Sequence, residues 1–273
     1  MTKSKSIRAL VVVSDTHCGS VVGLMPPNFE TSEGNKIAHN AVQNFLWESW
    51  LDAVRFVEDT LAGSAYALVL NGDAIEGDHH GTKQIWSKDI ADHVECAGQV
   101  LGMLSRRANK TYIVRGTECH THNTEVTLGK ILNAEKNPDS KLPAFDRLHL
   151  RVAGVPCAFR HHIGTSVKSW TESTALAGAL AEEIIQAVRN GEEPPRVVCA
   201  AHRHKFGVIQ NAHGMCVVSP PWQMLTRFGF KAVPEARTQP GIYILDWRDK
   251  EDGELPDVHE RIYRAPKQTT ITI

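Results

Sequence analysis

The stretch VVVSDTH (Val11–His17) joins a run of β-branched residues to an aspartate and a histidine. A run of this kind predicts a strand buried on both faces, with the polar side chains at its end. The same plan recurs in VLNGD (Val69–Asp73), IVRGTECH (Ile113–His120), AFRHH (Ala158–His162) and VCAAHRH (Val198–His204). Side chains that follow the strands of an open α/β sheet converge on one crevice. The five stretches therefore predict one site built from five strand ends.

Length and charge indicate the class of protein. A chain of 273 residues with 42% hydrophobic content predicts one domain spanning residues 1–273, with a substantial core. The formal net charge of −1 provides no overall positive field for polyanions. Extended contact with nucleic acid is therefore disfavoured, although a local groove for nucleic acid remains open.

The cellular setting is predicted from the first residues and from the cysteines. The first apolar run, Ala9–Val13, is too short for a signal peptide or a membrane span. Six cysteines are scattered without CxxC pairing, which is typical of reduced thiols in an intracellular protein. We therefore expect a cytoplasmic protein with no membrane partner; the oligomeric state is left open.

Alternating strand and helix patterns predict an α/β fold. Apolar positions at helical spacing run from Val42 to Leu61, from Ile90 to Leu104 and from Leu176 to Val188. A mostly parallel sheet is expected from strands at Ile7–Val13, Tyr66–Leu70, Thr111–Val114 and Arg196–Ala200. Antiparallel strands completing a second sheet are expected at Phe206–Gln210, Met215–Val218, Gly241–Trp247 and His259–Tyr263. The result would be two packed sheets flanked by helices.

Two connections are longer than ordinary loops. They cover residues 18–37 and 219–240, and segments of this length are often lids or binding loops. Ordinary surface loops without a function explain the two segments equally well. Aromatic side chains of the second segment, Trp222 among them, are interpreted first as packing residues and second as a surface for a nucleobase.

The motifs together resemble the calcineurin-like metallophosphoesterase superfamily. Its pattern is Asp-x-His, Gly-Asp, Gly-Asn-His-Asp/Glu, His and Gly-His-x-His, and the similarity runs from Asp15 to His204. The resemblance implies a four-layer α-β-β-α sandwich of two mixed sheets. It also implies two metal positions with Asp73 between them. One would be held by Asp15, His17 and His204, and the other by His202 with one of His161 and His162.

The third motif departs from the family pattern. The chain has Gly116-Thr117-Glu118-Cys119-His120, so the amide ligand is absent and the histidine comes later. Glu118 is our candidate replacement ligand because a carboxylate binds a dication better than a hydroxyl does, and Thr117 is the alternative. His120 would be the general acid that protonates the leaving oxygen, or else a further ligand.

Adjacent histidines raise two more questions. If the strand persists through His161 and His162, only one of them can face the crevice, and we favour His161. The other would support a ligand or face the substrate. His79 and His80 follow Asp73 in a glycine-rich loop, where they would contact phosphate or else face solvent. Glu76, in the same loop, is interpreted as a surface acid.

The resemblance predicts a cofactor and a chemistry. The mixed histidine and carboxylate donors suit two divalent cations, Mn²⁺ foremost, with Fe, Zn, Co or Ni as alternatives to Mn²⁺ and all preferred over Ca or Mg. Two such cations turn a shared water into hydroxide near neutral pH and neutralise phosphoryl oxygens. The sequence contains neither a Gly-x-Ser-x-Gly elbow nor a Walker-type phosphate loop, so two competing mechanisms are removed.

The predicted function is hydrolysis of a phosphomonoester or phosphodiester, with a phosphodiesterase favoured and a small phosphate ester or nucleotide as substrate. The Asp-Arg-Gly of protein phosphatases is replaced by residues 74–77, AIEG, which argues against that class. A nuclease acting on DNA or RNA ends is the alternative. A non-catalytic scaffold of the same fold is a further alternative, supported only by the altered third motif.

Overall fold

The first sheet of the computed structural model has the strand order β12-β11-β1-β4-β5. The structure describes residues 6–78, 81, 83–121, 123–164, 171–232 and 238–265. Strands β1, β4 and β5 run parallel, whereas β11 pairs antiparallel with β1 and with β12. The bounds are β1 Ala9–Val13, β4 Ala67–Asn71, β5 Lys110–Val114, β11 Gly241–Asp246 and β12 Asp257–Ile262.

The second sheet has the order β6-β7-β8-β10-β9. Strand β8 pairs parallel with β7 and with β10, and the two edge strands pair antiparallel with their neighbours. A separate two-stranded ribbon joins Phe29–Glu30 (β2) to Lys36–Ile37 (β3). The bounds in the second sheet are β6 Leu148–Val152, β7 Val155–Phe159, β8 Val197–Ala200, β9 Gly207–Asn211 and β10 Gly214–Val218.

The predicted distribution of strands between the sheets was wrong in two places. Strand β8, expected in the first sheet, lies in the second, and β11 and β12, expected in the second, lie in the first. The physical reason is that β8 and β11 are both buried along their whole length. A strand that is apolar on both faces fits the interior of either sheet. The choice between the sheets therefore depends on contacts that are distant in sequence.

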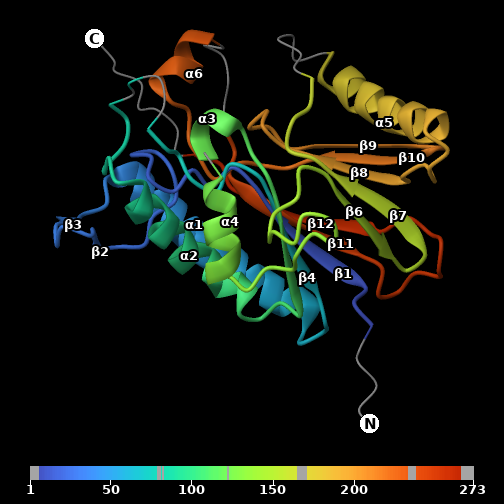
Figure 1. Cartoon of the computed structure of the whole chain (residues 1–273), viewed down its shortest axis with the longest axis horizontal. Helices are drawn as coiled ribbons and strands as arrows, with labels where there is room; N and C mark the ends of the chain where they lie inside the picture. The colour runs from blue at the N-terminus through green and yellow to red at the C-terminus, as the bar shows by residue number, and fades with distance from the viewer. Residues whose placement is uncertain are drawn as a thin grey trace, which may run out of the picture.

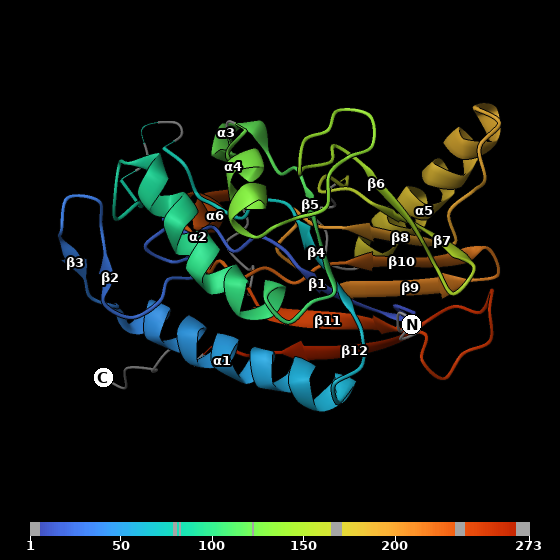
Figure 2. The ribbon, with the colours of Figure 1, turned by 60° about the horizontal axis from the view of Figure 1, so that its bottom comes forward.

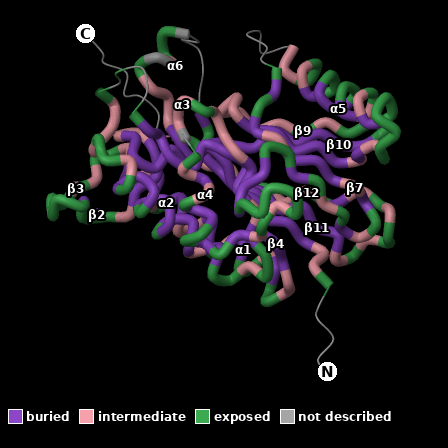
Figure 3. Tube along the Cα trace, viewed as in Figure 1, coloured by how far each residue is buried: buried purple, intermediate pink, exposed green. Residues whose placement is uncertain are grey.

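Three apolar layers lie between four layers of secondary structure, as the predicted α-β-β-α sandwich requires (Figures 1 and 2). Strand β1 shows the alternation, because Val11 faces the helices on one side while Leu10 and Val12 face the second sheet. In β8, Val198 and Ala200 face the helix α5 on the opposite outer side. The buried trace in Figure 3 runs through the strands of both sheets.

Two long helices cover the first sheet and one covers the second. On the first sheet lie α1 (Ala41–Leu61) and α2 (Ile90–Ser105), with the shorter α4 (Thr124–Ile131) packed on α2. On the second sheet lies α5 (Glu172–Arg189), whose predicted apolar stripe ends early, since Val188 is 62% exposed. The remaining helices are α3 (Glu118–Thr121) and α6 (Arg227–Ala232). Across the described segments, no helix has the length and apolar content needed to span a membrane.

The two long connections are tied to the core where they begin. In the first, Cys18 N–H donates to the carbonyl of Ala74 at 3.0 Å, and Leu24 is completely buried. In the second, Trp222 N–H donates to the carbonyl of Asp15 at 2.9 Å, and its ring packs edge-on against Trp50 with a centroid separation of 5.0 Å. Trp222 is therefore a packing residue, and both segments form walls close to the first motif.

Candidate metal centre

Side chains that follow all five predicted strand ends meet in one cluster. Their ligand atoms form four groups, each with all its atoms within 4.8 Å of one another. The first group is Asp15, His17 and His204; the second is His161, His162 and His202; the third is Asp15, Asp73 and His161; the fourth is His17, Glu76 and His120. Because the third group shares a member with each of the first two, and the fourth shares His17 with the first, the cluster is continuous.

The backbone is held in an unusual conformation at this cluster. Asp15, His17, Asp73, His202 and His204 all have positive φ values, between 41° and 70°. Non-glycine residues rarely adopt this left-handed region, which costs of the order of 1–3 kcal/mol per residue, and such strain gathers at functional sites. The sharp turns after β1, β4 and β8 therefore aim these side chains at a common point.

Two glycines allow the turns to approach each other closely. A Cβ on Gly72, whose φ is 90°, would lie 2.2 Å from His161 Nδ1. A Cβ on Gly116 would lie 2.2 Å from Asp73 Oδ1. Both positions therefore exclude any side chain, which explains the glycine in the second and third motifs.

Asp73 lies at the centre of the cluster. Its Oδ2 is 2.9 Å from His161 Nε2 and 3.9 Å from His17 Nε2. Burial would raise the pKa of the Asp73 carboxyl, but the His161 and His17 rings outweigh it and hold that pKa well below its usual range. An ionised carboxylate with two acceptor oxygens is the residue type that a bridging position requires.

The first group offers two imidazoles and a carboxylate. Asp15 Oδ1 lies 3.3 Å from His204 Nε2 and 3.9 Å from His17 Nε2. Burial raises the pKa of Asp15, yet His204 and His161 lower it further, so the net shift is downward. Within the described part of the chain, the buried Asp15 Oδ1 accepts no well-aligned hydrogen bond. A buried carboxylate oxygen without a well-aligned hydrogen-bond donor is suited to bind a cation.

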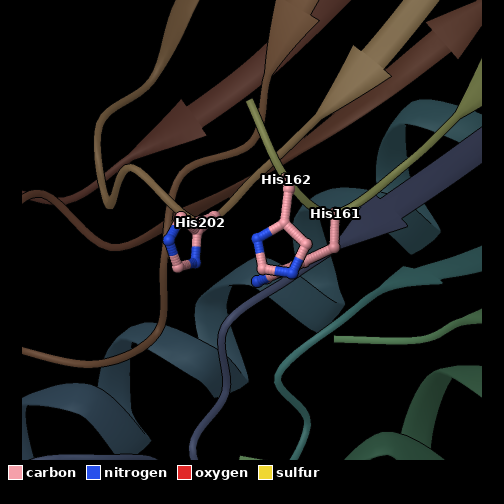
Figure 4. A group of neighbouring side chains, drawn as sticks. All are labelled: His161, His162 and His202. Carbon is pink, nitrogen blue, oxygen red and sulfur yellow. The ribbon is translucent and has the colours of Figure 1, made fainter. Parts of the chain in front are cut away.

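The second group consists of His161, His162 and His202, which Figure 4 shows as neighbouring rings. Their centroids are separated by 5.1 Å (161–162), 5.2 Å (161–202) and 4.7 Å (162–202). Burial and the neighbouring His161 lower the pKa of both His162 and His202, which favours the neutral form of those two rings. Neutral imidazoles are metal ligands, so His162 and His202 also fit a cation.

The condition under which only one of His161 and His162 would face the crevice, a strand that continues through both, is not met. Strand β7 ends at Phe159, so the alternation of side chains does not continue through the two histidines. His161 is buried, and its Nδ1 is 2.8 Å from the carbonyl of Asn71, which leaves Nε2 toward Asp73. His162 is exposed and lies on the open side of the same group.

Thr117, and not Glu118, lies beside the clustered side chains. The Thr117 N–H and hydroxyl donate to the two carboxylate oxygens of Asp73 at 2.6 and 3.1 Å, and the hydroxyl is 3.3 Å from His202 Nδ1. Glu118 is exposed at the start of α3 and belongs to none of the four groups. The candidate replacement ligand therefore lies outside the cluster, because the chain turns into a helix directly after Thr117.

His120 lies beside the first group. Its ring contacts that of His17 edge-on at 4.8 Å, and its Nδ1 is 2.7 Å from the carbonyl of Glu76. Burial and the neighbouring His17 lower the pKa of His120 to about 4. His120 shares the fourth group of neighbouring ligand atoms with His17 and Glu76.

Glu76 also belongs to the cluster, in the fourth group with His17, although the sequence did not predict it there. It is 3% exposed, and its Oε2 lies 2.8 Å from His17 Nδ1, so the interpretation as a surface acid was wrong. Burial lowers the pKa of His17, but Glu76, Asp73 and Asp15 raise it to about 9. The available signal was its position three residues after Asp73, in a loop that must pass close to His17. His79 and His80 lie outside the described residues.

Comparisons with known proteins show a likeness of fold. No family model matches the sequence, and no curated protein matches it. An archaeal phosphodiesterase is 10% identical with a TM-score of 0.46, over 93% of this chain and 99% of the other. Vps29 of Entamoeba histolytica, solved with Zn²⁺, is 12% identical with a TM-score of 0.41, over 93% and 98%. A predicted phosphoesterase of Streptococcus pneumoniae is 11% identical with a TM-score of 0.35, over 93% and 98%. These likenesses concern the path of the chain and not its chemistry.

Proposed function

We propose that this chain is a dinuclear-metal phosphoesterase that hydrolyses a small phosphate ester or nucleotide, with phosphodiesters favoured over monoesters. One observation carries the proposal: the Asp15–Asp73–His161 group joins a set of ligands on either side into a single cluster. A mononuclear site would not need ligands from both sets. Asp15, His17 and His204 would hold one cation, His161, His162 and His202 would hold the other, and Asp73 would lie between the two.

The residues present support particular roles. When bound, two divalent cations supply Lewis-acid activation of water and neutralise charge on phosphoryl oxygens. Thr117 holds both oxygens of Asp73 and so fixes the orientation of that carboxylate. His120 would protonate the leaving oxygen, and the negative charge of a bound phosphate would raise its pKa from the low value set by the protein groups.

The preference for a diester is supported by the surroundings of Arg115 and Arg203, the arginines of the third and fifth motifs. Arg115 pairs with Asp146 at 3.3 Å and donates to Asn123 at 2.7 Å. Arg203 lines a separate cavity of 280 Å³ between α5 and β9. With these two guanidinium groups directed elsewhere, neither would add positive charge for a dianionic monoester, whereas a diester carries a single charge.

Paired chromogenic substrates test the proposal. We expect the protein purified with Mn²⁺, and in parallel with Zn²⁺, Co²⁺, Ni²⁺ or Fe²⁺, to hydrolyse bis-p-nitrophenyl phosphate faster than p-nitrophenyl phosphate. Asp73→Asn, which keeps the shape and removes the charge, should abolish turnover and reduce bound metal. A preference for the monoester would overturn the diester assignment. Bound metal with no turnover of either substrate would favour a non-catalytic scaffold.

A further inference from the structure

Glu76 occupies a buried position between the first metal group and a distant segment of the chain. Its N–H donates to the carbonyl of Cys18 at 2.9 Å, which fixes the backbone beside the Asp-x-His motif. Its Oε2 lies 2.8 Å from His17 Nδ1 and accepts a hydrogen bond from Gln223 Nε2 at 2.7 Å. A carboxylate that is 3% exposed loses most of its hydration, so contacts of this kind are what keep it in place.

The contact with Glu76 decides which nitrogen of His17 is available. Nδ1 faces Glu76 in a bent contact, while Nε2 faces Asp15 Oδ1 and Asp73 Oδ2, at 3.9 Å from each. A proton on Nδ1 is stabilised by the carboxylate, and the lone pair is then on Nε2, between two further carboxylates. Carboxylates that hold the outer nitrogen of a ligand histidine fix its tautomer and raise its basicity.

Gln223 makes the segment after β10 part of this arrangement. It is 4% exposed, and its Nε2 also lies 3.2 Å from Ser20 Oγ. The preceding residue, Trp222, donates its N–H to the carbonyl of Asp15. Two consecutive residues therefore hold the backbone of one ligand and the carboxylate that faces another.

We propose that Glu76, held by Gln223, is a positioning residue that sets the tautomer and orientation of His17 and so raises the affinity of the first metal position. This inference rests on the proposed metal centre. The main-chain carbonyl of Glu76 also receives Nδ1 of His120 at 2.7 Å. A change of the Glu76 side chain leaves that carbonyl in place, so metal affinity and the orientation of His120 can be separated.

Glu76→Gln tests the inference by stepwise Zn²⁺ titration against a chromophoric chelator. Loss of a carboxylate partner to a ligand histidine lowers metal affinity roughly 10–100-fold, and we expect this loss at one position only. Gln223→Ala should weaken the same position by a smaller factor. The pattern should match that of His204→Ala, which removes a ligand of the first group. Glu183→Gln is the matched control, because Glu183 is 5% exposed and pairs with Arg147 and Arg160 on the α5 side.

Nitrogen-15 NMR of the imidazoles in the Zn²⁺-loaded wild-type protein provides a readout that needs no variant. We expect His17 to carry its proton on Nδ1. A proton on Nε2, or Glu76→Gln with both affinities within a factor of about three of wild type, would overturn the inference. An equal loss at both positions with an altered circular dichroism spectrum would assign Glu76 a purely structural role. Failure of the wild-type protein to bind any metal would instead refute the proposed function.

Discussion

Removal of the His162 ring should weaken one metal position without disturbing the fold. The ring is exposed and, in the described part of the chain, contacts the rings of His161 and His202. An exposed substitution of this kind usually changes stability by no more than about 0.5 kcal/mol. If His162 is a direct ligand, its loss should cost more than the roughly 100-fold upper limit for a supporting partner. That corresponds to at least about 2.8 kcal/mol of binding free energy, since each tenfold change is about 1.4 kcal/mol.

Competitive Zn²⁺ titration of His162→Ala, with thermal unfolding of the chelator-treated protein, measures both quantities. We expect one affinity to fall by more than about 100-fold, the other to stay near the wild-type value, and the midpoint of unfolding to be unchanged. His213→Ala, on the exposed turn between β9 and β10, is the matched control. Two Zn²⁺ affinities within a factor of about three of wild type would refute the view of the second group as a three-imidazole site.

Three further predictions follow from the same geometry. Glu118→Gln should keep two bound metals and most of the activity because the side chain is exposed; loss of one metal would return Glu118 to the ligand set. Gly72→Ala should displace His161 and reduce the amount of bound metal. Gly178→Ala, whose new Cβ would lie in open space on α5, should instead stabilise the fold by about 0.5–1 kcal/mol. Equal changes in bound metal and in unfolding free energy for the two variants would contradict this prediction. Folding raises the pKa of His17 and of His161 from 6.5 to about 9, so the folded protein holds protons that the unfolded chain has lost in this pH range. The free energy of unfolding of the chelator-treated protein should therefore fall as the pH rises from 6.5 to about 9, by roughly 3 kcal/mol per histidine. A midpoint of unfolding that stays flat or rises across this range would refute the last prediction.

Most of the candidate site could be predicted because its residues follow strands. Asp15, Asp73, His202 and His204 come within a few residues of a strand end, where the chain must turn at the edge of the sheet. Their spacing from apolar runs is a local property, readable without any tertiary contact. Helices α1, α2 and α5 were likewise evident from apolar spacing, although Val188 extended the predicted stripe of α5 beyond the part that is buried.

The third motif shows the limit of predictions made from neighbouring residues alone. A carboxylate is the better ligand by chemistry, which favoured Glu118 over Thr117. The direction of a side chain is decided by the backbone, however, and here the chain enters α3 so that Glu118 faces outward while Thr117 faces Asp73. The end of β7 at Phe159 had the same effect at the adjacent histidines, because a strand continued through His162 would have turned one of the two rings away.

Most strand positions, the apolar faces of the long helices and most residues of the candidate metal cluster could thus be predicted from the order of the amino acids, since periodicity and the residues at strand ends depend on near neighbours alone. Only the folded chain shows how β8, β11 and β12 are distributed between the two sheets. The same is true of the burial of Glu76 against His17 and Gln223. In these cases the partners are up to 237 residues apart, as between Ala9 of β1 and Asp246 of β11. Pairing across such distances is selected by the packing of whole layers, and the sequence around each partner carries no record of it.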